Sequence, residues 1–123
     1  MPAKKILLVD DEEGILAIGE LALGELGYET RTAVDGAQGW QALQLEEFDL
    51  LITDHNMPNL TGLELIRRVR AAHLEIPVMM VTGYLPLAEM HAAPELLPQT
   101  ILEKPFTAKQ LTHAVQVALG EAA

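Results

Sequence analysis

The chain has 123 residues, a formal net charge of −10 and no cysteine. Its length fits one domain, and its hydrophobic content of 50% is enough to build a core. The acidic balance argues against binding to nucleic acid, and the lack of cysteine excludes disulfides, thiolate chemistry and zinc bound through sulfur. The apolar run at residues 6–9 is too short for a membrane span or a signal peptide, so we expect a cytoplasmic protein without a membrane partner.

Short apolar runs alternate with longer amphipathic stretches from the start of the chain. Residues 6–9 predict a buried strand, and the helix that follows is expected to end at Gly27. The inward face of that helix is predicted from apolar residues at steps of three and four, namely Ile15, Ile18, Ala22 and Leu26. Residues 28–33 are more polar and suit an edge strand. Asp35 is expected to cap the second helix, with Gln38 three residues further on.

The second half of the chain continues the same alternation. Buried strands are predicted at residues 50–52, 78–81 and 101–102. Thr61 and Thr107 each stand three residues before a Glu or Gln, which is the capping-box pattern that opens a helix. Three prolines interrupt residues 84–99, so the helix between the fourth and fifth strands is predicted to be short, at about residues 87–92.

A strand followed by a helix thus occurs five times along the chain. Apolar strands separated by helices predict a parallel sheet that is covered on both faces. Right-handed crossovers then make a doubly wound α/β fold, with five strands flanked by helices. In such a sheet, functional groups collect where the carboxyl ends of the strands meet.

Polar residues follow four of the predicted strands. Asp10 and Asp11 follow the first strand, Asp54 the third, Thr82 the fourth and Lys104 the fifth. We therefore expect three carboxylates, a hydroxyl and an ammonium in one crevice. Hard oxygen ligands without His or Cys suit Mg²⁺, and a lysine adds a compact positive charge. Taken singly, each residue has a plainer explanation as a helix-capping or loop residue, but together they favour phosphoryl transfer.

Four segments at these positions resemble the response-regulator receiver family of two-component signalling systems, the CheY-like domains. They are ILLVDDE at residues 6–12, DHNMPNLTG at 54–62, VTG at 81–83 and EKPF at 103–106. The segments stand in the order of the family, and the resemblance covers essentially the whole chain. It implies a single receiver domain over residues 1–123 and a flavodoxin-like sheet with strand order 2-1-3-4-5.

The resemblance also implies a phosphoacceptor and a metal site. Asp54 would take the phosphoryl group as an acyl phosphate. Asp11, Asp54 and the backbone carbonyl of Asn56 would bind Mg²⁺, or Mn²⁺ in its place, and Asp10 would act through a bound water. The protein would then be a regulatory phosphoacceptor rather than an enzyme, and we expect it to catalyse its own phosphotransfer and dephosphorylation.

The remaining positions carry expectations of different kinds. By resemblance, Lys104 would pair with a phosphoryl oxygen, Thr82 would be the switch hydroxyl, and the bond before Pro105 would be cis. Many receivers have an aromatic residue three positions before the lysine, where this chain has Ile101, so the usual paired switch is in question. His55 is expected to be an ordinary loop histidine, although it adjoins the phosphoacceptor.

The resemblance implies partners of two kinds. A histidine kinase or a histidine phosphotransfer protein would supply the phosphoryl group from a phosphohistidine. A downstream protein or a fused output domain would receive the signal, and homodimerisation on phosphorylation is a further option. Whether the chain is a stand-alone regulator or part of a longer regulator or hybrid kinase is left open.

Three other functions compete with this interpretation. A degenerate receiver that binds a partner constitutively is the main alternative, and Ile101 keeps it open. A Mg²⁺-dependent phosphohydrolase commonly needs an acid two residues after its nucleophile, where this chain has Asn56. A flavin- or nucleotide-binding domain needs a Gly- or Ser/Thr-rich phosphate loop after the first strand, where the acidic run 10–13 would repel a phosphate in the absence of a metal.

Overall fold

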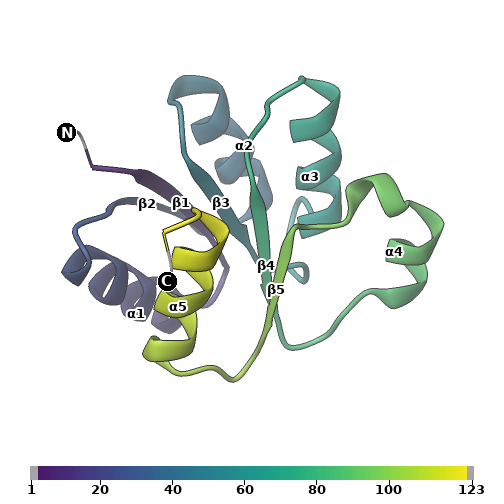
Figure 1. Ribbon diagram of the computed structural model, residues 1–123. Helices are drawn as coiled ribbons and strands as arrows, with labels where there is room; N and C mark the ends of the chain where they lie inside the picture. Colours follow the sequence, from purple (N-terminus) through teal and green to yellow (C-terminus); the bar gives the residue numbers. More distant parts are fainter. Residues whose placement is uncertain (1–2, 122–123) are drawn as a thin grey trace.

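Five parallel strands lie side by side in the order β2-β1-β3-β4-β5 (Figure 1). The computed structural model describes residues 3–121. The strands are β1 (Lys5–Val9), β2 (Glu29–Ala33), β3 (Leu50–Thr53), β4 (Val78–Thr82) and β5 (Thr100–Glu103). This order confirms the predicted doubly wound sheet, with the polar β2 at one edge and the apolar β1 and β3 inside.

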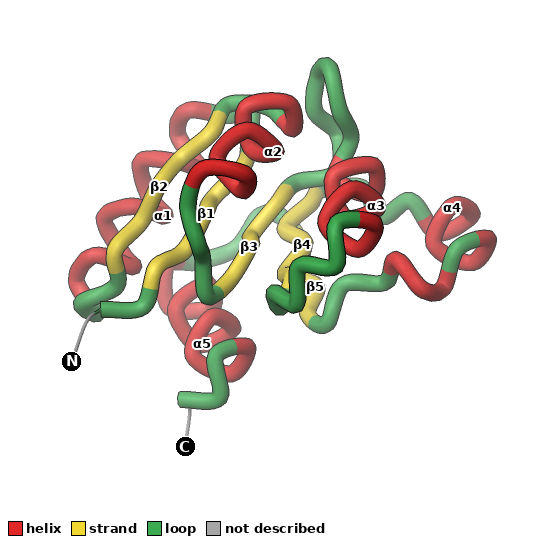
Figure 2. Tube along the Cα trace, turned by 90° about the horizontal axis from the view of Figure 1, so that it is seen from above, coloured by secondary structure: helices red, strands yellow, loops and turns green. Residues whose placement is uncertain are grey.

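Helices cover both faces of the sheet (Figures 1 and 2). They are α1 (Glu13–Glu25), α2 (Gly36–Leu45), α3 (Gly62–Ala71), α4 (Leu87–Ala92) and α5 (Ala108–Ala118), with a 3₁₀ turn, η1, at Pro94–Leu96. The cluster on the side of α2 and α3 takes Leu7 and Val9 of β1, and the cluster on the side of α1 and α5 takes Ile6 and Leu8. Over residues 3–121, no helix combines the length and apolar character needed to cross a membrane.

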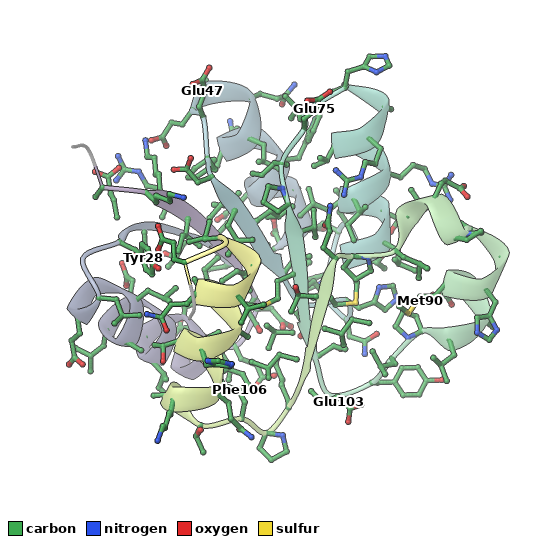
Figure 3. All side chains as sticks on the ribbon, viewed as in Figure 1. Tyr28, Glu47, Glu75, Met90, Glu103 and Phe106 are labelled. Atoms are coloured by element: carbon green, nitrogen blue, oxygen red, sulfur yellow. The ribbon has the colours of Figure 1, made fainter. Side chains whose placement is uncertain are left out.

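Helix ends follow the predicted capping residues. The side chain of Asp35 accepts a hydrogen bond from the backbone N–H of Gln38 at 2.8 Å, and both predicted capping boxes, at Thr61 and Thr107, are formed. The fourth helix is as short as predicted, since Pro86 precedes it and Pro94 begins the next turn. Its Met90 is 5% exposed and packs into the core on the α3 side (Figure 3).

The predicted inward face of α1 was only partly right. Ala22 is buried as predicted, but Ile18 and Leu26 are 49% and 43% exposed, and Leu16, Gly19 and Leu23 are buried in their place. The reason lies at Gly19, where an added Cβ would stand 2.4 Å from Cδ2 of Leu8. The helix approaches β1 most closely at this glycine, and a glycine adds nothing to the apolar periodicity from which the face was predicted.

Gly62 begins α3 and lies so close to the backbone after β3 that a residue with a Cβ would not fit. A Cβ at this position would lie 2.3 Å from the carbonyl oxygen of Asp54 and 2.9 Å from Cα of His55. Because both neighbours are backbone atoms, no rotation of a side chain can relieve the clash. The start of α3 is thereby held directly against the end of β3.

We therefore predict that Gly62→Ala lowers the free energy of unfolding by about 1–3 kcal/mol, as overpacking of a tight contact does. Urea denaturation of the two proteins measures the difference. Gly14→Ala is the matched control, since a Cβ at Gly14 meets nothing within 4 Å. This control is expected to be as stable as wild type or more stable by up to about 1 kcal/mol. Equal stability of wild type and Gly62→Ala would contradict the packing argument.

Candidate functional site

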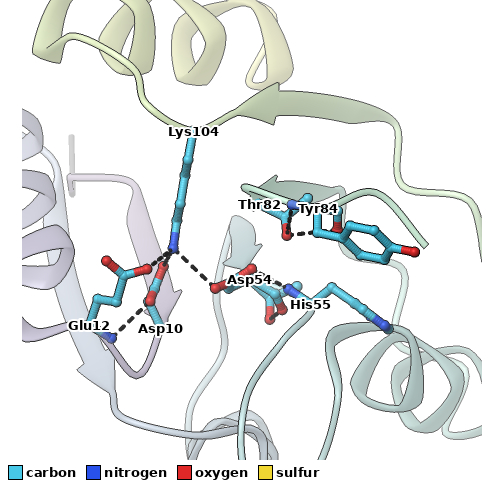
Figure 4. A network of polar contacts seen from close by, with 8 residues as sticks. Asp10, Glu12, Asp54, His55, Thr82, Tyr84 and Lys104 are labelled. Carbon is cyan, nitrogen blue, oxygen red and sulfur yellow. Dashed lines mark hydrogen bonds and ion pairs between the residues drawn. The ribbon is translucent and has the colours of Figure 1, made fainter. Parts of the chain in front are cut away.

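Asp10, Asp54 and Lys104 come together at the carboxyl edge of the sheet (Figure 4). Each stands one residue beyond its strand, and its backbone N–H still donates to a neighbouring strand: Asp10 to the Ala33 carbonyl at 3.1 Å, Asp54 to Val9 at 3.0 Å and Lys104 to Thr82 at 2.9 Å. The sheet therefore fixes the backbone from which all three side chains start. The predicted meeting of these residues at one sheet edge is confirmed.

Lys104 is the cation at the centre of this cluster. Its Nζ lies 2.9 Å from Oδ2 of Asp10, 3.0 Å from Oδ2 of Asp54 and 2.8 Å from Oε1 of Glu12. Burial alone would lower the pKa of Lys104, but hydrogen bonds to the three carboxylates outweigh it and hold the pKa well above its ordinary value. The lysine is therefore protonated across the physiological pH range.

The two aspartates are almost fully buried, Asp10 being 1% and Asp54 5% exposed. Burial raises the pKa of Asp10, and the backbone N–H of Glu12 and the nearby Lys104 only partly oppose this rise. Asp54 is held by the backbone N–H of His55, which donates to its Oδ1 at 2.6 Å, while Oδ2 faces Lys104. Both oxygens of the predicted phosphoacceptor thus have a donor.

Glu12 also belongs to the cluster, although its sequence position did not predict a role in the site. One carboxylate oxygen each from Asp10, Glu12 and Asp54 lies within 4.8 Å of the others. Asp11 is exposed and lines the open hollow of about 280 Å³ beside the cluster, which Asn56 and Lys104 also line. The only signal for Glu12 was the length of the acidic run that follows β1.

These residues fit a hard divalent cation. The donors around the hollow are carboxylate and carbonyl oxygens, which are the ligands that Mg²⁺ prefers. Three carboxylates against one ammonium leave an excess of negative charge, and the raised pKa of Asp10 reflects the cost of burying such charge. A cation held here would offset that excess.

Thr82 lines the same hollow, but its hydroxyl bonds within its own loop. The hydroxyl donates to the carbonyl of Tyr84 at 3.1 Å and accepts from the N–H of Tyr84 at 3.3 Å, while the Tyr84 side chain is largely exposed.

The peptide bond between Lys104 and Pro105 is cis, as predicted. Ile101, at the position discussed for an aromatic residue, is 41% exposed on β5.

The expectation for His55 was wrong, because its ring is buried rather than free in a loop. Its side chain is 8% exposed, and its Nε2 lies 3.3 Å from a carboxylate oxygen of Glu89 on α4. Its Nδ1 accepts a hydrogen bond from the N–H of Leu63 at 3.4 Å. The ring therefore joins the residue after Asp54 to both α3 and α4, which local sequence could not predict since Glu89 is distant along the chain.

Comparisons with known proteins agree with this arrangement. The sequence model of the family described as "Response regulator receiver domain" matches residues 6–116. Chemotaxis protein CheY1 of Helicobacter pylori strain J99 is 37% identical over 120 residues, covering 94% of this chain and 97% of that protein. The alkaline phosphatase synthesis transcriptional regulatory protein PhoP of Bacillus subtilis is 32% identical over 116 residues, covering 94% of this chain but only 48% of PhoP.

Solved structures show the same likeness. The crystal structure of a CheY-like response regulator receiver domain protein from Methanospirillum hungatei JF-1 superposes with a TM-score of 0.89 at 28% sequence identity. The match covers 97% of this chain and 95% of that one. The similarity therefore extends over the whole fold and is not restricted to the four segments around the site.

The buried charge of Asp10 generates a prediction about stability without metal. The folded state raises the pKa of Asp10, so folding favours the protonated carboxyl. The contribution of this group to stability is therefore fully present below the ordinary aspartate pKa of about 3.9 and is lost as the pH rises through the raised pKa. Asp10→Asn keeps an acceptor for the Glu12 N–H and removes the buried charge. At pH 7 it should raise the free energy of unfolding by an amount on the order of 1 kcal/mol.

Urea denaturation in the presence of a chelator, at pH 7 and at about pH 4, measures the effect. The gain from Asp10→Asn should shrink at the lower pH, where wild-type Asp10 is increasingly protonated. The control is Asp11→Asn at an exposed position, for which we expect a change within about 0.5 kcal/mol. A less stable Asp10→Asn variant at pH 7 would mean that the ion pair with Lys104 outweighs the cost of burial.

Proposed function

The chain belongs to the response regulator receiver domain family, and on that basis we propose that Asp54 accepts a phosphoryl group from a phosphohistidine. The donor is a histidine kinase or a histidine phosphotransfer protein. The observation that carries the proposal is the environment of Asp54, whose buried carboxylate lies between the ammonium of Lys104 and the N–H of His55. It also lines the acidic hollow that Thr82 and Asn56 share.

The chemistry is a displacement at phosphorus. An oxygen of the Asp54 carboxylate forms a bond to phosphorus, the phosphorus–nitrogen bond of the phosphohistidine breaks, and the imidazole leaves with the electron pair. Lys104 then stabilises the charge on the phosphoryl oxygens, which is the main task of a protein in this reaction. The product is an acyl phosphate on Asp54, and attack by water at the same site later releases inorganic phosphate and restores the carboxylate.

Receiver domains bind Mg²⁺ at an acidic pocket, and we assign the ion here to Asp11, Asp54 and the backbone carbonyl of Asn56, with Asp10 acting through a bound water. When bound, Mg²⁺, or Mn²⁺ in its place, supplies the positive charge that three carboxylates require while a phosphoryl group approaches. Lys104 is already protonated and is shared among three carboxylates. Its ammonium can therefore exchange one carboxylate oxygen for an oxygen of the incoming phosphoryl group without gaining a proton.

We further propose that the whole described chain acts as one receiver domain and that Thr82 is the switch hydroxyl. In the present arrangement this hydroxyl bonds only weakly to its own loop, at 3.1 and 3.3 Å, so a phosphoryl oxygen on Asp54 can compete for it. The output is a partner protein or a fused domain, since the relatives include both the short CheY1 and the longer PhoP. Dimerisation on phosphorylation is part of the same proposal.

One observation favours the alternative of a binding module that needs no phosphorylation. Ile101 has no ring or phenolic hydroxyl and is already partly exposed, so the motion that couples a threonine to an inward-turning aromatic has no counterpart at this position. The two functions differ in whether Asp54 reacts at all. A direct chemical test therefore separates them before any partner is known.

We predict that a small-molecule phosphodonor with Mg²⁺ adds one phosphoryl group to the wild-type protein, detected as an increase in intact mass. The adduct should be absent in Asp54→Asn, which keeps the shape of the side chain, and absent when a chelator replaces the metal. Thr82→Ala should still be labelled, because its hydroxyl is assigned to the switch and not to bond formation. An unlabelled wild-type protein that binds Mg²⁺ would leave the binding module as the better description.

A further inference from the structure

The loop between β3 and α3 is tied to a helix that carries none of the residues assigned to the site. Asn59, in this loop, donates from its Nδ2 to Oδ2 of Asp35 at 2.9 Å. The other oxygen of Asp35, Oδ1, accepts from the backbone N–H of Gln38 at 2.8 Å and caps α2. One carboxylate thus has two separate tasks, one for its own helix and one for the loop.

Packing beside this hydrogen bond is equally close. A Cβ at Gly36, the first residue of α2, would lie 2.4 Å from the carbonyl oxygen of Leu60 and 2.6 Å from its Cβ. The loop backbone therefore rests directly on the start of α2, next to Asn59. Asn59 itself has a φ of 70°, a left-handed conformation that asparagine tolerates better than most residues but that still costs free energy. Contacts of the surrounding structure keep a residue in such a conformation.

The two ends of the loop are fixed independently of Asn59. At the start, the N–H of Asp54 donates to Val9 of β1 at 3.0 Å, and at the end, the N–H of Gly62 donates to the carbonyl of His55 at 3.0 Å. Asn56 lies between these fixed points, is exposed and lines the hollow beside Asp54. The hydrogen bond to Asp35 ties residue 59 of the loop to the start of α2, beside the buried side chains of Met57 and Leu60, which also hold the loop.

We propose that Asp35 and Asn59 are positioning residues for the cation site, with their hydrogen bond holding the loop so that the backbone of Asn56 stays at the edge of the hollow. This inference rests on the proposed function, in which the Asn56 carbonyl binds Mg²⁺. Neither side chain contacts the cation or the phosphoryl group. Their effect on the site passes through the loop backbone.

The cap and the tether can be separated experimentally. Ser caps a helix about as well as Asp does, so Asp35→Ser keeps one oxygen to accept from the N–H of Gln38 but has no second oxygen to accept from Asn59. Asn59→Asp places two carboxylates against each other. The combined exchange, Asp35→Asn with Asn59→Asp, restores one donor and one acceptor and leaves the net charge of the chain unchanged. Asn59→Gly removes the bond without changing charge or forbidding the positive φ.

The experiment measures Mg²⁺ affinity by calorimetry and amide hydrogen exchange at residues 56–61 in metal-free protein. Asp35→Ser and Asn59→Gly should each weaken Mg²⁺ binding about fivefold, the effect of losing one ordinary hydrogen bond, and should speed exchange in the loop. The combined exchange should return both readouts to within about twofold of wild type. Glu13→Gln, at an exposed acid on α1, controls for the loss of one charge and should leave loop exchange unaltered.

The proposal would be overturned if both single variants showed wild-type Mg²⁺ affinity and wild-type amide exchange in the loop. It would also be overturned if the double variant folded but did not regain Mg²⁺ affinity. If Asp35→Ser unfolds, Asn59→Gly alone decides the matter, because it leaves the cap intact. A wild-type protein that does not bind Mg²⁺ would refute the proposed cation site instead. Loop exchange in metal-free protein would still show whether Asp35 and Asn59 hold the loop.

Discussion

Lys104 supplies one ammonium to the carboxylates of Asp10, Glu12 and Asp54 at the edge where the strands end. Charges as deeply buried as those of Asp10 and Asp54 are costly, and the cost is reduced only when each has a partner at close range. The Glu12 carboxylate, by contrast, is mostly exposed. The parallel sheet meets this requirement because its backbone hydrogen bonds continue one residue past each strand. The ammonium is nevertheless outnumbered, and this imbalance makes the site suited to a divalent cation and to a phosphoryl group that arrives with it.

The sheet can hold this charge because the helices around it lie unusually close. Gly19 of α1 and Gly39 of α2 approach β1 from opposite faces, where an added Cβ would stand 2.4 Å from Leu8 and 2.9 Å from Val9. The four apolar residues of β1 are 0–3% exposed, so the strand that leads to Asp10 has almost no freedom to move. Gly62 provides a comparable contact between α3 and the end of β3.

Much of this architecture could be predicted because it depends on local patterns. Strand runs, capping residues such as Asp35 and Thr61, and the prolines around α4 act within a few residues of themselves, and their elements formed where expected. The gathering of Asp54 and Lys104 followed from topology alone, since consecutive strands of a parallel sheet end at one edge. No side-chain geometry was needed for that step.

The features that could not be predicted depend on contacts between distant parts of the chain. The inward face of α1 was partly misassigned because Gly19, which has no side chain, sets the closest approach. Glu12 joins Lys104, and His55 meets Glu89, through side-chain conformations that only the folded structure defines. The roles assigned to Asp11 and Thr82 remain predictions, since neither is bonded to Asp54 in this arrangement.

Stability and function are therefore divided between different parts of this chain. The buried carboxylate of Asp10 and the left-handed conformation of Asn59 both oppose folding. Apolar strands, capped helices and glycine contacts supply the compensating free energy, and of these contacts the one at Gly62 lies directly against the backbone of Asp54. The packed strands and helices keep the carboxylates from moving apart. Their mutual repulsion can therefore be reduced by a bound cation but not by a change in their positions. On the proposed function, this rigidity would leave the Thr82 hydroxyl and the Lys104 ammonium as the groups that respond to a phosphoryl group on Asp54.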